Sequence, residues 1–227
     1  MRVTEVAVAD GEPPVLLAVE PAGTRDPDDD WAELSGPERA ATAAMDAVRA
    51  EEFVRGRSLL RRLAGSVLGL PGPRVPLALE PGGRPYLEGL AAGVSLSHTE
   101  GCTAAAVRPC GAVGVDVQRP PESVDDRLVR RCCGVWAERV LSLPGPARAA
   151  AFARVWAVQE ACVKSLGQGI FAEPWRIAVP PGAGGGRWGE VSWRSLPEVA
   201  SAALAVAAPR LISPVPHTPA GVDDVCP

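Results

Sequence analysis

The stretch from residue 93 to 121 limits the fold of this chain more than any other part of its sequence. It reads GVSLSHTEGCTAAAVRPCGAVGVDVQRPP, in which turn-forming residues separate three short apolar segments. We expect three short strands here, the last of them ended by Pro120 and Pro121. Short, antiparallel strands among helices indicate an α+β fold rather than a doubly wound parallel sheet.

Helical spacing of apolar residues predicts helices on both sides of these strands. Two helical segments are expected within residues 35–70, where Ser35 can cap the first and Pro37 suits its first turn. A further helix is expected over 125–143, and a longer one over 147–166 that Gly167 ends.

The remaining segments predict short extended pieces and loops. Residues 25–31, RDPDDDW, lack the spacing and closing glutamate of a calcium loop and are expected to be a polar loop. Short extended pieces are expected within 75–89. Residues 174–196 are expected to form two strands around a Gly-rich loop, and residues 200–208 a strand or a short helix. The tail 213–227 is expected to be disordered.

Composition excludes several classes of function. The 227 residues carry a net charge of -4, which argues against a broad basic surface for nucleic acid. No apolar run approaches the length of a membrane span, and the first residues lack the apolar segment of a signal peptide. None of the six cysteines forms a Cys-x-x-Cys pair and only two histidines are present, so we expect no zinc site. Reduced thiols in a cytoplasmic protein are the expected state.

One lysine stands among the 23 basic residues, and it occupies a helix with a second charged residue. Lys164 follows Glu160 by four residues in WAVQEACVKSLGQG, so both side chains lie on one helix face. A surface ion pair is the simple alternative, worth a few tenths of a kcal/mol. The apolar residues around the pair favour a position at the edge of the core instead.

Two polar residues alternate with valines in AVGVDVQ, residues 112–118. On a strand, Asp116 and Gln118 point from the same face, roughly 6–7 Å apart. A carboxylate and an amide so placed can both offer oxygen to one hard cation. The alternative is an edge strand with an ordinary solvated face.

Ser97 and His98 follow an apolar strand in VSLSHTEG, residues 94–101. A hydroxyl and an imidazole at a strand end can bind a phosphate. A hydrogen-bonded loop histidine without a functional role is the alternative.

Together these segments resemble the 4′-phosphopantetheinyl transferases, in the larger, single-chain (Sfp-type) class. GVDVQ is similar to the Gly-x-Asp-x-Glu motif of that family, and WAVQEACVKSLGQG to Trp-x-x-Lys-Glu-Ala-x-x-Lys-x-x-Gly. GRP at 83–85 resembles Gly-Lys-Pro, SLSHT the Ser-His segment, and RGRSLLRRL at 55–63 an arginine-containing helix. The order and spacing agree over about residues 30–205.

The resemblance implies an enzyme that moves the phosphopantetheine arm of coenzyme A to a serine of an apo acyl or peptidyl carrier protein, and releases 3′,5′-ADP. It implies Mg²⁺ held by Asp116 and Glu160, with Gln118 as a further ligand. Glu160 is then the candidate general base, and Lys164 balances charge on the transferring phosphate. The phosphates of coenzyme A would be bound by the remaining candidates, which are Ser97, His98, Arg57, Arg61 and Arg84, with Arg62 as a further one.

Three positions depart from the family pattern. Gln118 replaces an acidic residue, Gln159 replaces a lysine beside the catalytic glutamate, and Arg84 replaces a lysine but keeps its charge. A binding module that retains coenzyme A or a carrier protein but has weakened catalysis is therefore the alternative hypothesis. Retention of Asp116, Glu160 and Lys164 favours the enzyme.

The family fold implies two similar α+β halves about a pseudo-two-fold axis, with coenzyme A in the cleft between them. The halves would be 1–108 and 109–212. The resemblance also implies a monomer that acts on carrier proteins of secondary metabolism, such as polyketide and non-ribosomal peptide carriers. The carrier protein would bind across the mouth of the cleft, and no nucleic acid or membrane is expected as a partner.

Overall fold

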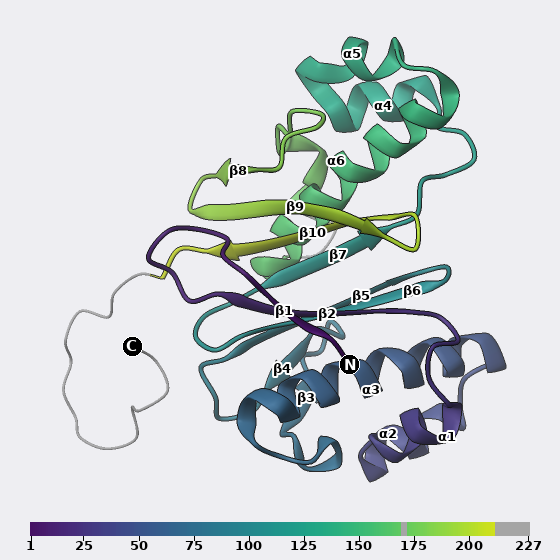
Figure 1. The fold of residues 1–227 in the computed structure, drawn as a ribbon, viewed down its shortest axis with the longest axis vertical. Helices are drawn as coiled ribbons and strands as arrows, with labels where there is room; N and C mark the ends of the chain where they lie inside the picture. The colour runs from purple at the N-terminus through teal and green to yellow at the C-terminus, as the bar shows by residue number, and fades with distance from the viewer. Residues whose placement is uncertain (169–171, 212–227) are drawn as a thin grey trace.

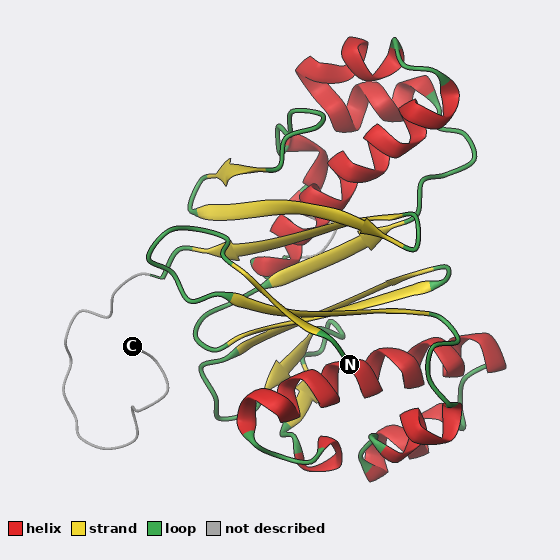
Figure 2. Ribbon diagram, in the orientation of Figure 1, coloured by secondary structure: helices red, strands yellow, loops and turns green. Residues whose placement is uncertain are grey.

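The structure, a computed structural model, describes residues 1–168 and 172–211. Two antiparallel four-stranded sheets lie face to face in the middle of the molecule, with strand orders β1-β2-β6-β5 and β7-β10-β9-β8. One long helix covers the outer face of each sheet, so that the layers run helix, sheet, sheet, helix (Figures 1 and 2). The prediction of an α+β fold with antiparallel strands is confirmed.

The first sheet and its helices come from the N-terminal part of the chain. Its elements are β1 (Val3–Val6), β2 (Val15–Pro21), α1 (Pro27–Ala32), α2 (Gly36–Thr42), α3 (Ala47–Leu68), the 3₁₀ turn η1 (Gly72–Arg74), the small hairpin β3 (Leu77–Leu79) and β4 (Pro85–Leu87), β5 (Gly93–Thr99) and β6 (Cys102–Arg108).

The second sheet and its helices follow directly. Its elements are β7 (Gly114–Gln118), α4 (Asp126–Cys133), η2 (Gly134–Trp136), α5 (Ala137–Leu141), α6 (Gly145–Ser165), η4 (Pro174–Arg176), β8 (Gly185–Trp188), β9 (Val191–Val199) and β10 (Ala202–Pro209).

The order of strand, long helix and hairpin occurs in both parts of the chain. In the first part, β2 precedes α3 and pairs with β6, which pairs with β5. In the second part, β7 precedes α6 and pairs with β10, which pairs with β9. The chain passes from one sheet to the other between Arg108 and Gly114. The pseudo-two-fold axis and the division near residue 108 stay predictions.

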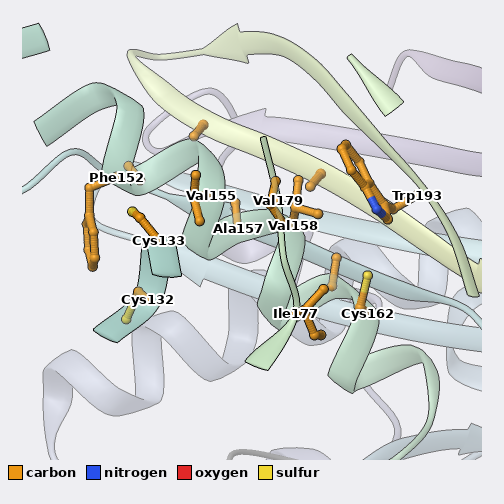
Figure 3. Close-up of a cluster of buried hydrophobic side chains, with 14 of the residues drawn as sticks. Cys132, Cys133, Phe152, Val155, Ala157, Val158, Cys162, Ile177, Val179 and Trp193 are labelled. Carbon is orange, nitrogen blue, oxygen red and sulfur yellow. The ribbon is translucent and has the colours of Figure 1, made fainter. Parts of the chain in front are cut away.

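Small apolar side chains fill the space between the two sheets. Val115 and Val117 of β7 meet Ala104 and Ala106 of β6 in this layer, and all are fully buried. The outer face of the first sheet packs on Leu59 and its neighbours in α3. The outer face of the second sheet packs on α6 in a cluster that holds Phe152, Val155, Val158, Cys162, Ile177 and Trp193 (Figure 3).

Most predicted elements are present, and four predictions are wrong. Residues 27–32 form a helix, because the Asp26 side chain accepts a hydrogen bond from the backbone N–H of Asp28 and Pro27 occupies the first turn. The helix expected over 125–143 is interrupted at Gly134, which has a φ of 50°. Pro144 and Gly145 begin α6 instead of only preceding it. Residues 174–176 are a 3₁₀ turn, and the first strand of that segment is β8, inside the Gly-rich stretch.

Residues 1–24 carry no predicted element, whereas the structure has β1 and β2 there. The final strand β10 agrees with one of the two forms expected for 200–208. The prediction for the tail 213–227 lies outside the described residues.

Four thiols, those of Cys102, Cys132, Cys133 and Cys162, are free and buried, as expected. For Cys110 the expectation of a reduced thiol is wrong, since it is disulfide-bonded. Among the described residues, no helix is both long enough and apolar enough to cross a membrane.

Candidate active site

Asp116 lies at the centre of strand β7 and is only 1% exposed. The alternation of the strand turns Val115 and Val117 into the layer between the sheets and Asp116 to the opposite face. Burial of a carboxylate is costly unless hydrogen bonds or opposite charges compensate it. The contacts of Asp116 therefore identify the groups that compensate its buried charge.

Strand β7 is an edge strand whose free backbone N–H groups face strand β5. Three hydroxyl groups of β5, in positions that alternate along the strand, accept hydrogen bonds from these groups. Ser95 Oγ accepts from Val115 N at 3.1 Å, Ser97 Oγ from Val117 N at 3.3 Å, and Thr99 Oγ1 from Arg119 N at 3.3 Å. We call this contact the hydroxyl seam. It joins the two sheets at the strand that carries Asp116.

Ser97, Asp116 and Lys164 form a closed triangle. Ser97 Oγ donates to Asp116 Oδ1 at 2.8 Å, and Lys164 Nζ lies 2.5 Å from the same oxygen. Lys164 Nζ also donates to Ser97 Oγ at 3.0 Å. Charge-assisted hydrogen bonds of this kind are shorter and stronger than neutral ones. The buried Asp116 carboxylate is thus compensated by Ser97 of β5, in the first sheet, and by Lys164 of α6, the helix that covers the second sheet.

Helix α6 reaches this triangle because Gly114 has no side chain. A Cβ at Gly114 would collide with the carbonyl oxygen of Ala161 in α6. The absence of this carbon lets α6 lie directly on β7, so that Glu160 and Lys164 face Asp116. This close approach is the physical reason for the glycine two residues before Asp116.

Glu160 has a partly buried carboxylate that lacks a hydrogen-bond partner on one side. Its Oε1 atom is buried and, within residues 1–168 and 172–211, accepts no hydrogen bond. Burial raises the pKa of Glu160 above its ordinary value, the Asp116 charge raises it further, and Lys164 lowers it. Among the described side chains, Lys164 is paired with Asp116 and not with Glu160, contrary to the simple surface pair.

The donors around Asp116 fit a magnesium ion. Mg²⁺ is commonly held by one or two carboxylates and keeps several waters. Asp116 and the unpartnered Glu160 Oε1 supply that set. Over the described residues, no group of three or more His, Cys, Asp or Glu side chains is arranged as a metal site.

The two glutamine replacements have different environments. Gln118 Nε2 donates to Asp116 Oδ2 at 2.9 Å, so its amide lies in the site. Gln159 is fully buried on another face of α6, where its Nε2 donates to the carbonyl groups of Cys132 and Ile177 at 2.7 and 2.8 Å. Gln159 therefore holds α6 to neighbouring segments and does not face Asp116.

Arg57 and Arg61 have partners other than Asp116, Glu160 and Lys164. Arg61 is 2% exposed, lies 2.5 Å from Glu38 Oε2 and donates to the carbonyl groups of Gly72 and Val75. Arg57 is buried and faces the other oxygen of Glu38 at 3.9 Å. These arginines join α3 to α2 and to the turn after α3. Arg62 is likewise paired, with Glu20.

Arg84 and His98 are more exposed. Arg84, in the hairpin β3–β4, lies against Gly167 at the end of α6, since a Cβ at Gly167 would collide with its guanidinium. This contact brings the GRP segment beside the helix of Glu160 and Lys164. His98 alternates with Ser97 along β5, and its side chain, 48% exposed, faces Glu52 of α3 at 4.0 Å. Ser97 and His98 therefore point to different places.

Two arginines that the sequence analysis did not select, Arg25 and Arg55, line a small polar cavity with Thr103. Thr103 is the strand partner of His98 in β6. The Nε atom of Arg55 is buried and has no hydrogen-bond partner among the described residues, whereas Arg25 Nε lies 2.9 Å from Asp30 Oδ1 in an ion pair. Arg25 precedes the acidic run DPDDD, and this context made it look like part of a solvated loop.

Comparisons with known proteins agree with this geometry. Residues 112–205, which run from just before β7 into β10, match the family model of the 4′-phosphopantetheinyl transferase superfamily. The chain is also 30% identical over 138 residues to the 4′-phosphopantetheinyl transferase HetI of Nostoc sp., an alignment that covers 57% of each protein. The chain thus spans less than two thirds of the length of that relative. The similarity to this superfamily therefore includes the part of the chain that holds Asp116, Glu160 and Lys164.

Proposed function

We propose that this protein transfers the 4′-phosphopantetheine arm of coenzyme A to a serine hydroxyl of an apo carrier protein and releases 3′,5′-ADP, with Mg²⁺ as cofactor. The observation that carries the proposal is the meeting of Asp116, Glu160 and Lys164 where α6 crosses β7. Two carboxylates and one ammonium are the groups that a metal-assisted transfer of a phosphate group requires.

Asp116 and Glu160 would hold the metal ion. When bound, Mg²⁺ would neutralise charge on the pyrophosphate of coenzyme A. The unpartnered Oε1 of Glu160 supports this role, because a metal ion would satisfy a buried oxygen that otherwise costs stability. Gln118 would contribute less, since its amide nitrogen already donates to Asp116.

Glu160 is the candidate general base. In the proposed step, the carrier serine oxygen forms a bond to the β-phosphorus of coenzyme A, and the bond from this phosphorus to the 3′,5′-ADP oxygen breaks. The serine proton passes to Glu160, directly or through one water. The raised pKa of Glu160 supports this role, because a carboxylate of higher pKa is a stronger proton acceptor.

Lys164 would balance the charge that develops on the transferring phosphate. Its Nζ is a compact point charge that fits between Asp116 Oδ1 and Ser97 Oγ. A planar guanidinium has a different shape and hydrogen-bond geometry. This difference accounts for the single lysine in a chain whose other basic residues are arginine.

The phosphates of coenzyme A would contact cations on the other side of the site. Arg84 is suited to this because it lies at the end of α6, and His98 because its side chain is exposed. Arg57 and Arg61 are engaged with Glu38, so we propose Arg55, in the cavity beside the strand partner of His98, in their place.

The carrier protein would approach through a groove beside Gln118. This groove, of about 240 Å³, is lined by apolar side chains that include Leu128, Phe152 and Trp156, with Arg119 at its edge. A carrier of polyketide or non-ribosomal peptide synthesis, acted on by a monomer in the cytoplasm, is the substrate that the larger, single-chain class implies.

The test is intact-protein mass spectrometry of an apo carrier protein after incubation with this protein, coenzyme A and Mg²⁺. A gain of one phosphopantetheine that EDTA or Asp116→Ala abolishes is the expected result. No gain with several carrier types, despite measurable coenzyme A binding, would support a binding module instead.

A further inference from the structure

We propose that Ser97 is a positioning residue that holds Asp116 and Lys164 for transfer, and that it does not bind a phosphate of coenzyme A. This inference rests on the proposed function. It changes the role that the resemblance implies for the Ser-His segment, and it depends on the contacts of one hydroxyl group.

Every hydrogen-bonding position of the Ser97 hydroxyl is already used. A serine hydroxyl has one hydrogen to donate and two lone pairs that accept. The hydrogen is donated to Asp116 Oδ1, and the lone pairs accept from Val117 N and Lys164 Nζ. A phosphate oxygen needs a donor, and Ser97 has no second hydrogen to give. Its side chain is also buried.

Strand geometry separates Ser97 from the phosphate side of the site. Successive residues of a strand point to opposite faces, so Ser97 and His98 cannot approach one phosphate with both side chains. Ser97 points to β7 and α6, whereas His98 faces Glu52 of α3. Ser97 therefore contacts Asp116 and Lys164, whereas His98 is exposed on the side of α3.

Ser97 fixes where the charges of Asp116 and Lys164 meet. Its hydroxyl touches both groups and is anchored by the backbone of Val117, next to Asp116 in the chain. Residues that orient a metal-binding carboxylate in this way commonly change activity or metal affinity about 10- to 100-fold when removed. Ser97 alone would thus connect the seam to the groups that act in transfer.

Ser95 supplies a matched control. It is buried in the same strand and accepts a hydrogen bond from Val115 N at 3.1 Å, but the contacts of its hydroxyl do not include Asp116 or Lys164. Ser95→Ala and Ser97→Ala each remove one hydroxyl from the seam. A difference between the two variants therefore reports the contacts to Asp116 and Lys164, and not the loss of a buried hydrogen bond.

The experiment measures three quantities for wild type, Ser97→Ala, Ser97→Thr and Ser95→Ala. These are kcat and KM for coenzyme A with Mg²⁺, the Kd for coenzyme A in EDTA by calorimetry, and the Tm. We expect Ser97→Ala to lower kcat about 10- to 100-fold with KM and Kd unchanged, and Ser97→Thr, which keeps the hydroxyl, to recover part of the loss. Ser95→Ala should match Ser97→Ala in Tm and wild type in kcat.

Two results would overturn the inference. A Kd in EDTA that weakens about tenfold in Ser97→Ala, a loss of roughly 1.4 kcal/mol, would make Ser97 a coenzyme A ligand. An equal loss of kcat in Ser95→Ala would make the seam purely structural. If Ser97→Ala does not fold, Ser97→Cys, with a thiol that is a weak donor, takes its place. No transfer by wild type would instead overturn the proposed function, and the Kd comparison would still decide the role of Ser97.

Discussion

Glu160→Gln should make the protein more stable while it abolishes transfer. The substitution keeps the size of the side chain and removes a carboxylate that burial and the Asp116 charge both disfavour. A buried group without a partner costs about 1–3 kcal/mol, and more when it is charged, so the neutral amide should cost less than the carboxylate. We take about 1 kcal/mol for this difference because Glu160 is only partly buried. In a chain of 227 residues this corresponds to a rise in Tm of about 2–4 °C.

The rise in Tm that Glu160→Gln gives over wild type should become smaller as the pH falls. The pKa of Glu160 is raised in the folded protein above the ordinary value of 4.5, so the folded state binds its proton more tightly than the unfolded chain does. That contribution to wild-type stability is complete below pH 4.5 and is lost as the pH rises through the folded pKa. The Tm advantage of Glu160→Gln is therefore expected at pH 7 and should disappear as the pH falls toward 4.5.

The assay is thermal unfolding in EDTA across this pH range, with Glu122→Gln, an exposed glutamate, as the control that should not change. Added Mg²⁺ and coenzyme A should raise the Tm of wild type more than that of Glu160→Gln, because a ligand stabilises only the form that binds it. Coenzyme A binding in EDTA should be retained. A lower Tm of Glu160→Gln in EDTA at pH 7 would refute the reasoning, since it would show that the carboxylate has a stabilising partner.

Three further substitutions test other contacts of the site. Gln118→Glu replaces the donor to Asp116 Oδ2 with a second carboxylate, so it should lower the Tm in EDTA and tighten Mg²⁺ binding. An unchanged Mg²⁺ dependence of transfer would place residue 118 away from the metal. Lys164→Arg keeps the charge but not the shape, and should lower kcat about tenfold or more; wild-type kcat would contradict the role given to a compact ammonium. Gly114→Ala should destabilise the fold by about 1–3 kcal/mol, because α6 would have to move from β7. Urea unfolding measures this loss, and an unchanged urea midpoint would mean that the helix can shift without cost.

The centre of the candidate site could be predicted from the sequence because its determinants are local. The alternation of β7 sets the direction of Asp116, and the spacing of four residues sets Glu160 and Lys164 on one face of α6. Gln118 was predicted beside Asp116 for the same reason. The meeting of β7 and α6 follows from the resemblance and, in the structure, from the bare backbone of Gly114.

The arginines could not be assigned from the sequence, because their partners are distant in the chain. The sequence around Arg61 is that of an amphipathic helix with basic residues. Its partner Glu38 lies 23 positions earlier in the chain, and the local pattern does not indicate that contact. From the sequence alone, Gln159 is interpreted as the loss of a positive charge beside the site. In the structure its amide instead donates to the carbonyl groups of Cys132 and Ile177, which come from other segments. Helix α1 was missed because its polar composition resembles a loop, although an acidic first turn suits the positive end of a helix.

The position of Lys164 has a practical consequence for chemical labelling. It carries the single side-chain amine of the sequence, and that side chain is 29% exposed at the candidate active site. A reagent that acylates lysine amines therefore has one side-chain target, and the extent of its reaction reports occupancy of the site directly. Bound coenzyme A should slow the labelling, so a single modified peptide could follow ligand binding without any engineered probe.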